Sequence, residues 1–189
     1  MEKEERDLVE RSIRGDRDAF AALYERSFGP VYAFVVSEVS DFDEARSICQ
    51  ETFLRAWNGL KGLKEPAAFG GWIRTIARNE ISRFRARPQT RAAARNVPIE
   101  DVAEPADGRA VDPAGAAAQR EFEDAVRDEL RDSPPVQREA VLLRVLAGLE
   151  YNEIATRLDI GLNEGKGLVI RGVAKLADRL ERRLGKEPS

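Results

Sequence analysis

The sequence lacks histidine altogether and holds a single cysteine, Cys49. The absence of histidine excludes the usual zinc-ligand sets and histidine acid–base catalysis, and one cysteine cannot form a disulfide within the chain. No apolar run approaches the roughly 20 residues that a membrane-spanning helix needs, and the first residues, MEKEERDLVE, are charged where a signal peptide would be apolar. We therefore expect a cytoplasmic protein with no metal, no cofactor and no membrane insertion.

The sequence also lacks groups of residues spaced as in catalytic sites. The chain has 34 acidic and 31 basic residues, but no carboxylate is spaced with a nucleophile, a metal-ligand set or a phosphate-binding loop. The sequence therefore predicts a protein that is not an enzyme.

Charge changes sign along the chain, although the net charge is only −3. Residues 74–95 include seven arginines and one acid, whereas residues 97–119 include five acids and one arginine. A local basic segment predicts a polyanion-binding surface whose affinity falls with salt. A solvated helix face followed by a polar linker gives the same pattern, and charge alone does not separate the two interpretations.

The acidic stretch also marks a domain boundary. Residues 87–119 contain four prolines and no aromatic residue, which is too little apolar surface to offset the entropy of ordering. On both sides apolar residues recur at spacings of three and four, and no sustained alternation indicates a strand. We predict an all-α protein with two small helical domains, 1–90 and 120–186, joined by a flexible acidic linker over 91–119.

Four helices are expected in the first domain. Gly15-Asp16 breaks the first helix, and Asp16 caps the second. The third begins near Asp41 to Glu44 and stops at Asn58-Gly59, and Pro66 opens the fourth.

The second domain is expected to begin with an amphipathic helix over 121–130, followed by a helix over 136–147. Helices over 151–158 and 162–184, separated by three residues, have the spacing of a helix-turn-helix. An ordinary helical hairpin has similar spacing, so this pattern alone does not identify a DNA reader.

Three ordered blocks carry a family resemblance: QETFLRAWNGL (50–60), FGGWIRTIARNEISRFRAR (69–87) and PPVQREAVLLRVLAGLEYNEIA (134–155). With an acidic linker between the second and third blocks, the chain resembles an extracytoplasmic-function (ECF) sigma factor of bacterial RNA polymerase over almost its whole length. The resemblance implies that the first domain, sigma region 2, binds the clamp of the polymerase's largest subunit and recognises and melts the minus-10 promoter element.

The same resemblance implies that the second domain, sigma region 4, reads the minus-35 element beside the flap of the second-largest subunit. The implied partners are core RNA polymerase, promoter DNA and an anti-sigma factor, which could hold the protein at the membrane.

The resemblance assigns the polymerase contacts to the third helix. The implied residues are Asp43, Glu44, Gln50, Glu51 and Arg55. Without the resemblance, acids here would only solvate the helix or favour its N-terminus. Arg46 and Ser47 stand where the family commonly has acids, so we expect either weaker polymerase binding or a greater dependence on the remaining contacts. Cys49 is expected to be a buried spacer and not a redox switch.

Recognition of the minus-10 element requires a surface that holds bases once they leave the stack, with cations for phosphates and amides for hydrogen bonds. The glycine- and lysine-bearing loop 58–64 beside the arginine-rich fourth helix offers both. The implied residues are Asn58, Lys61, Lys64, Trp72, Arg74, Arg78, Asn79, Arg83 and Arg85. Two alternatives stay open: Trp72 fits the periodicity of a core anchor, and Asn79 could cap or bridge helices.

The match is weakest in the reading helix of the second domain. The residues implied to contact the minus-35 element are Asn163, Glu164, Lys166, Arg171 and Lys175. Leu168 stands where an arginine is typical. Three glycines, 165, 167 and 172, each cost about 1 kcal/mol of helix stability relative to alanine. We therefore expect a frayed or altered reading helix with weak or unusual upstream specificity.

Two other functions are compatible with the sequence. One is a sigma-like regulator that binds DNA or polymerase without directing initiation, and it would give no promoter-selective run-off transcript. The other is a helical adaptor that binds a protein such as an anti-sigma factor, and it would tolerate charge reversal at Arg78 and Arg83.

Overall fold

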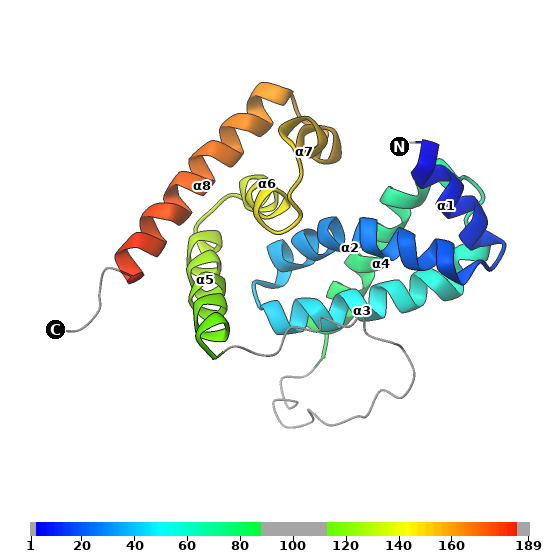
Figure 1. Cartoon of the computed structure of the whole chain (residues 1–189), viewed down its shortest axis with the longest axis horizontal. Helices are drawn as coiled ribbons and strands as arrows, with labels where there is room; N and C mark the ends of the chain where they lie inside the picture. The colour runs from blue at the N-terminus through cyan, green and yellow to red at the C-terminus, as the bar shows by residue number, and fades with distance from the viewer. Residues whose placement is uncertain (1–2, 88–112, 185–189) are drawn as a thin grey trace.

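The computed structural model describes residues 3–87 and 113–184, and every regular element in these two ranges is helical (Figure 1). The all-α prediction is therefore confirmed. The first domain consists of α1 (Lys3–Ile13), α2 (Arg17–Val39), α3 (Phe42–Gly59), the 3-10 turns η1 (Leu60–Gly62) and η2 (Pro66–Ala68), and α4 (Phe69–Arg85). The second consists of α5 (Pro113–Arg131), α6 (Pro135–Val145), α7 (Tyr151–Leu158) and α8 (Leu162–Leu184). None of the helices in these ranges is both long and apolar enough to cross a membrane.

Side-chain caps begin the second and third helices where the sequence predicts them. The Asp16 carboxylate accepts a hydrogen bond from the backbone N–H of Ala19 at 3.0 Å, and Asp41 accepts one from Glu44 at 2.9 Å. Each bond satisfies a backbone donor that the first helical turn leaves unpaired. Pro66 differs from the prediction: it opens the short turn η2, a common lead-in to an α-helix, and α4 follows that turn.

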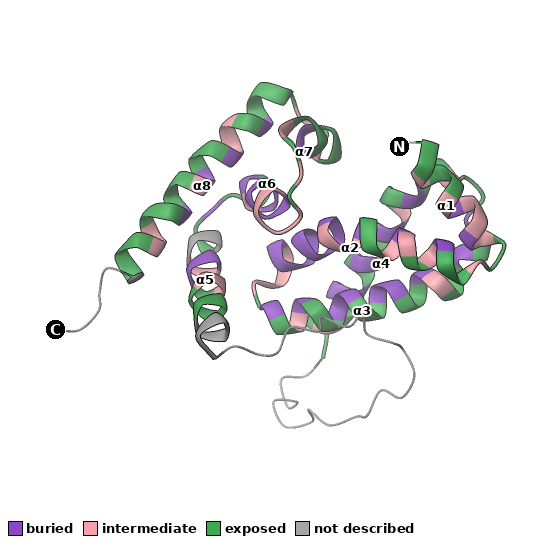
Figure 2. Ribbon diagram, viewed as in Figure 1, coloured by how far each residue is buried: buried purple, intermediate pink, exposed green. Residues whose placement is uncertain are grey.

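The middle of α2 is buried on every side. All seven residues from Val31 to Ser37 are buried, and they form the purple stretch of α2 in Figure 2. Helices α3 and α4 of the first domain and α6 of the second domain all pack against α2. A helix that is apolar all round is stable in water only when neighbours cover it from several directions. The two domains therefore share α2 as common packing surface.

The aromatic residues and the single cysteine fill the first domain's core. The Tyr24 and Phe53 rings meet edge to face at a centroid distance of 4.6 Å, and Phe20 lies 4.9 Å from Trp57. Cys49 is fully buried, as expected of a spacer. Burial raises the pKa of its thiol above the ordinary value, which disfavours the thiolate that redox chemistry needs.

Helices α7 and α8 begin and end at the predicted residues. Glu150 and Glu153 form a capping box at the start of α7, and Asp159 ends it in the left-handed region at φ 54°. Aspartate tolerates that conformation better than most residues.

Helix α5 begins earlier than expected. Residues 113–119, assigned to the linker from the sequence, form the first turns of this helix. The alanine-rich stretch AGAAA has high helix propensity, which an argument from low apolar content overlooks. The remaining part of the predicted linker, 91–112, lies outside the described residues.

The three glycines of α8 do not fray it: the helix is continuous from Leu162 to Leu184, so the fraying that the sequence suggested as one alternative was wrong. Two of them are positions of close helix approach. A Cβ at Gly165 would lie 3.4 Å from the Cβ of Ala155 in α7, and a Cβ at Gly172 would overlap the Cγ2 methyl of Val141 in α6. The two positions are seven residues apart and so share a face. The glycines therefore lower helix propensity and allow α8 to pack tightly against the rest of its domain.

We predict that Gly172→Ala destabilises the protein although alanine is the better helix former. The new methyl group must displace Val141, and overpacking of this kind costs about 1–3 kcal/mol. Gly167→Ala is the matched control in the same helix, since its Cβ would meet only the mobile end of the Arg171 side chain at 3.0 Å. The control should be neutral or stabilising by up to about 1 kcal/mol. Urea unfolding measures both, and equal effects of the two substitutions would contradict the packing argument.

Candidate nucleic-acid interface

A surface hollow lies between the end of α3 and the middle of α4. Its volume is about 510 Å³, and it is a shallow depression that is largely open to solvent. The residues that line it are Arg55, Asn58, Gly59, Trp72, Ile76, Asn79, Glu80 and Arg83. Five of the residues singled out from the sequence therefore meet in one place. One of them, Arg55, was assigned to polymerase contact and the other four to DNA.

Trp72 forms one wall of this hollow and also packs inward. Its side chain is half-buried, its ring lies 6.2 Å from that of Phe69, and a Cβ at Gly59 would lie 3.5 Å from its Cζ2 atom. The two roles considered for Trp72, core anchor and surface wall, are thus compatible in one position. Gly59 leaves the indole face close to the α3 backbone.

Glu80 organises the charge at the base of the hollow, and the sequence argument missed it. Only 6% of its side chain is exposed, and its Oε1 atom accepts a hydrogen bond from Arg83 Nη1 at 2.6 Å and forms an ion pair with Arg55 Nε at 2.8 Å. The carboxylate thereby ties the ends of two arginines from different helices to one point, while each guanidinium keeps further N–H donors for a ligand. The available signal was the single acid in the basic segment, three residues before Arg83.

The remaining residues near the hollow are exposed. Asn79 makes no side-chain hydrogen bond to the described residues, so the capping or bridging alternative finds no support there. Lys61 and Lys64 are exposed on a loop that is held by the buried side chains of Leu60 and Leu63. These cations therefore project from an anchored backbone.

Two arginines of the predicted minus-10 set are engaged elsewhere. Arg74 forms a two-pronged ion pair with Glu139 of α6, in which the Nη2–Oε2 distance is 2.7 Å, and its guanidinium lies 3.9 Å above the Phe34 ring. Arg85 donates to the Glu38 carbonyl oxygen at 2.8 Å and to its carboxylate at 2.9 Å. Arg78 remains exposed, 5.9 Å from the Phe34 ring centre. The basic helix thus divides its arginines between internal partners and the surface.

The residues predicted to bind polymerase follow the outer side of α3. Four of them, Asp43, Gln50, Glu51 and Arg55, are exposed and Glu44 is half-buried.

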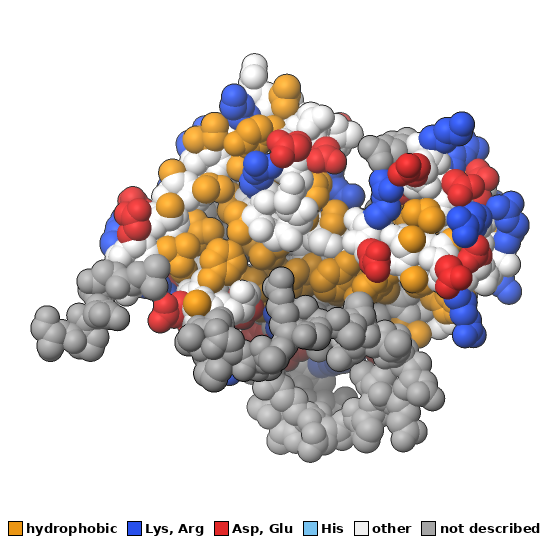
Figure 3. Space-filling view, in the orientation of Figure 1, with side chains coloured by type: hydrophobic (Ala, Val, Ile, Leu, Met, Phe, Trp, Pro, Cys, Tyr) orange, Lys and Arg blue, Asp and Glu red, His pale blue; other side chains and the backbone are white. Residues whose placement is uncertain are grey.

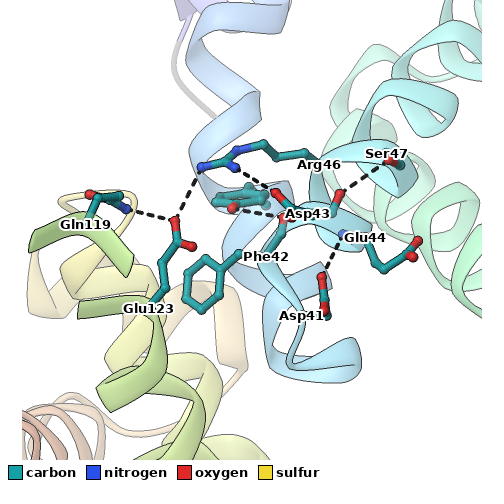
Figure 4. A network of polar contacts seen from close by, with 9 residues as sticks. Asp41, Phe42, Asp43, Glu44, Arg46, Ser47, Gln119 and Glu123 are labelled. Atoms are coloured by element: carbon teal, nitrogen blue, oxygen red, sulfur yellow. Dashed lines mark hydrogen bonds and ion pairs between the residues drawn. The ribbon is translucent and has the colours of Figure 1, made fainter. Parts of the chain in front are cut away.

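Arg46, one of the departures from the family pattern, contacts Asp43 at 3.3 Å and Glu123 of α5 at 3.4 Å (Figure 4). The figure also shows Gln119 donating to the same Glu123 carboxylate. Asp43 therefore lies beside the second domain, whereas Gln50, Glu51 and Arg55 lie further along α3.

The residues predicted to contact the minus-35 element all lie on the open side of α8. Asn163, Glu164, Lys166, Arg171 and Lys175 are exposed. Two large apolar side chains, Leu162 and Ile170, are also about half exposed at 53% and 50%, and the sequence argument did not single them out. Leu168, in contrast, packs against the core, so it faces away from this surface.

No metal site accompanies these surfaces. Within the described ranges, no three or more cysteine, aspartate or glutamate side chains are grouped so that they could hold an ion.

The structure defines an all-helical protein with a hollow on its first domain. Sequence comparisons identify the family to which this protein belongs. Residues 23–91 match the Sigma-70 region 2 family. The chain is 30% identical to the RNA polymerase sigma-H factor of Pseudomonas aeruginosa, over 90% of each protein. It is 34% identical to the ECF RNA polymerase sigma factor BldN of Streptomyces coelicolor, covering 90% of this chain and 64% of BldN. The chain therefore belongs to the ECF sigma factor family of bacterial RNA polymerase.

A solved structure shares the fold. The structure of CnrH in complex with the cytosolic domain of CnrY has a TM-score of 0.57 and 21% identity, and the match covers 95% of this chain and 99% of that one.

We predict that Glu80→Gln lowers the free energy of unfolding by about 1–2 kcal/mol. Loss of the buried carboxylate leaves Arg83 without this counter-charge and Arg55 with only Glu51 at 3.9 Å, and the penalty stays moderate because the two arginine side chains are 47% and 57% exposed. Glu51→Gln is the control: its 3.9 Å contact with Arg55 joins two exposed groups and should be worth less than about 0.5 kcal/mol. Chemical unfolding of both variants provides the comparison, and an equal loss in both would show that Glu80 has no special role.

Proposed function

We propose that this chain directs promoter-specific transcription initiation. In this proposal, α3 binds the clamp of the polymerase's largest subunit, the hollow between α3 and α4 holds the melted minus-10 element, and α8 contacts the minus-35 element. The observation that carries the proposal is the convergence of Arg55, Asn58, Trp72, Asn79 and Arg83 on one hollow. Family membership supplies the polymerase as partner.

The composition of the hollow suits a base that has left the duplex. Unstacking a base costs a few kcal/mol, so the protein must recover free energy from the single strand that results. The aromatic face of Trp72 offers stacking, worth about 1–3 kcal/mol per base, and the Asn79 amide can both donate and accept hydrogen bonds. Arg55 and Arg83, already held by Glu80, offer charged donors to flanking phosphates without further ordering of their side chains.

Contact with the minus-35 element rests on the exposed side of α8. Lys166, Arg171 and Lys175 can neutralise phosphates, and Asn163 can donate to and accept from an adenine edge. The half-exposed Leu162 and Ile170 add apolar surface of the kind that contacts thymine methyl groups. Upstream recognition in this chain then uses more apolar contact and fewer arginines than the family pattern.

An anti-sigma factor is the regulatory partner that this proposal includes. On the face shown in Figure 3, apolar side chains form a band across the middle of the molecule, where the two domains meet. Contiguous apolar side chains on a protein surface commonly mark protein-binding sites. A partner bound there would contact both domains at once. The chain itself performs no chemistry in this scheme, and catalysis belongs to the polymerase.

Run-off transcription tests the proposal. Purified chain and core polymerase are incubated with a library of random promoter sequences, and the products are sequenced. The expected result is a set of transcripts that share an upstream sequence and require the chain. Polymerase binding without any selected transcript would favour a sigma-like regulator, and the proposal would then be wrong.

We predict that Arg78→Glu reduces run-off transcription at least tenfold and leaves polymerase binding unchanged. Arg78 is an exposed cation of α4 that does not line the hollow, so reversal of its charge repels a strand that runs along the helix without removing an ion pair to the described residues. The control is Arg14→Glu, the same charge reversal at an exposed residue of the turn between α1 and α2. Transcript yield and core-polymerase affinity are measured for both. Full activity of the Arg78 variant would support the adaptor function and contradict the proposal.

A further inference from the structure

Helix α8 lies at one edge of the molecule, so one of its sides faces the rest of the second domain and the other faces outward (Figure 1). The residues of the inner side recur at spacings of three and four and are buried: Gly165, Val169, Gly172 and Leu176. The residues of the outward side, half a turn away, follow the same spacings: Asn163, Gly167, Ile170 and Ala174. We call these last four residues the outward row. In the proposed function, the outward row faces the base edges of the minus-35 element.

Gly167 leaves a gap in the outward row, and the end of the Arg171 side chain covers this gap. A Cβ built at Gly167 would lie 3.0 Å from Nη1 of Arg171 and 3.8 Å from both Cζ and Nη2. These are the three nearest atoms, and all of them belong to the guanidinium. Gly167 is accordingly half-buried, although the other three residues of the outward row are exposed. The planar group of Arg171 therefore lies in the outward row, at the level of Gly167.

The position of this guanidinium follows from helix geometry. Long side chains lean toward the N-terminus of their helix, so a residue covers the one four positions before it. Any side chain at position 167 would place its Cβ 3.0 Å from the guanidinium and would displace it. Arg171 is also exposed, and no hydrogen bond or ion pair joins it to another described residue. Its N–H donors are therefore available to a ligand.

We propose that Arg171 reads a guanine in the minus-35 element, with its guanidinium placed for this contact by the absence of a side chain at position 167. This inference rests on the proposed contact of α8 with that element. Two parallel N–H donors of a guanidinium match O6 and N7 of guanine in the major groove. A contact of this kind discriminates about 5- to 150-fold against the other bases. Arg171 thus determines sequence specificity and is not only a phosphate contact.

The cations on the flanks of the outward row suit a different role. A helix in the major groove turns its central row to the base edges and its flanks to the phosphates of the two strands. Lys166 and Lys175 lie on opposite flanks of α8, where they suit phosphates. Arg171 starts on the same flank as Lys175, but its guanidinium extends into the row. It is the one arginine between positions 162 and 178, so no neighbouring arginine could make the same contact.

The neighbours of the gap define the base pairs around the guanine. Asn163 lies about one turn before Gly167, and Ile170 lies about one turn after it. An α-helix rises about 1.5 Å per residue, so the step from position 163 to position 170 spans about 10 Å, or about three base-pair steps of DNA. An asparagine amide pairs with adenine, and an apolar side chain contacts the methyl group of thymine. The expected target is a G·C pair between two A·T pairs.

Selection of upstream sequences tests this inference. The chain is bound to core polymerase, and bound promoters are recovered and sequenced from a library that is random in the upstream region. The unmodified chain should enrich one G·C pair at least about fivefold over the other pairs at the same position. Arg171→Lys should abolish this enrichment, because lysine keeps the charge and lacks the fork of donors.

Gly167→Ala is the second variant, and it leaves every functional group of Arg171 in place. The added methyl group displaces the guanidinium from the outward row, so the guanine enrichment should fall to less than about half. Chemical unfolding should show no loss of stability, which separates the loss of specificity from misfolding. The double variant Gly167→Ala with Arg171→Lys should be as selective as Arg171→Lys alone, since both changes remove one contact.

Lys175→Ala is the matched control, because it removes an exposed cation from the flank on which Arg171 starts. It should weaken binding to all upstream sequences to a similar extent. The slope of log affinity against log salt should become smaller by about 0.9, the value of one phosphate contact. The guanine enrichment should stay as it is in the unmodified chain.

The outcomes separate this inference from the proposed function. If Arg171→Lys or Gly167→Ala keeps the full guanine enrichment, Arg171 does not read the base through the gap, and the inference is wrong while the proposed function stands. Enrichment of an upstream sequence without a guanine would have the same meaning. If the unmodified chain enriches no upstream sequence at all, α8 does not contact a minus-35 element, and that part of the proposed function fails together with the inference.

Discussion

Burial of α2 from Val31 to Ser37 is the constraint on which the rest of the structure depends. Since α2 is covered from several directions, α3 and α4 must pack against one part of it and α6 against another. The first contact positions the hollow between α3 and α4. The second brings Glu139 to Arg74 and the arginines of the second domain to the end of α2. The hollow and the domain contact are thus two consequences of one shared helix.

Local signals made the helices predictable from sequence. Asp16 and Asp41 cap helices through atoms only three residues away, and the bounds of α7 and α8 follow from capping and turn chemistry. The sequence singled out several residues that line the hollow, among them Trp72, Asn79 and Arg83, because they lie on one helix at known spacings. The sequence pattern did not predict contacts between residues that are distant in sequence: Arg74 and Glu139 are 65 residues apart, and no periodicity relates them.

Counting charges could not show which arginines serve the surface. A basic helix predicts polyanion binding through its net charge, yet Arg74 and Arg85 are bound by internal acids, and Arg83 shares Glu80 with Arg55. The glycines of α8 show that helix propensity has the same limit. Propensity alone predicts that they destabilise the helix, and only the packing against Val141 and Ala155 shows that they allow close helix contacts. Charge and helix propensity are properties of single residues, whereas function and stability in this protein depend on contacts between pairs of residues.

The departures from the family pattern fall where this chain makes contacts between its own parts. Arg46, which replaces an acid on α3, joins Asp43 to Glu123 of the second domain, and Leu168, which replaces an arginine on α8, packs against the core. Each change removes charge suited to an outside partner and adds a contact within the chain. Contacts within the chain stabilise the arrangement of the two domains described here, so both changes favour this arrangement.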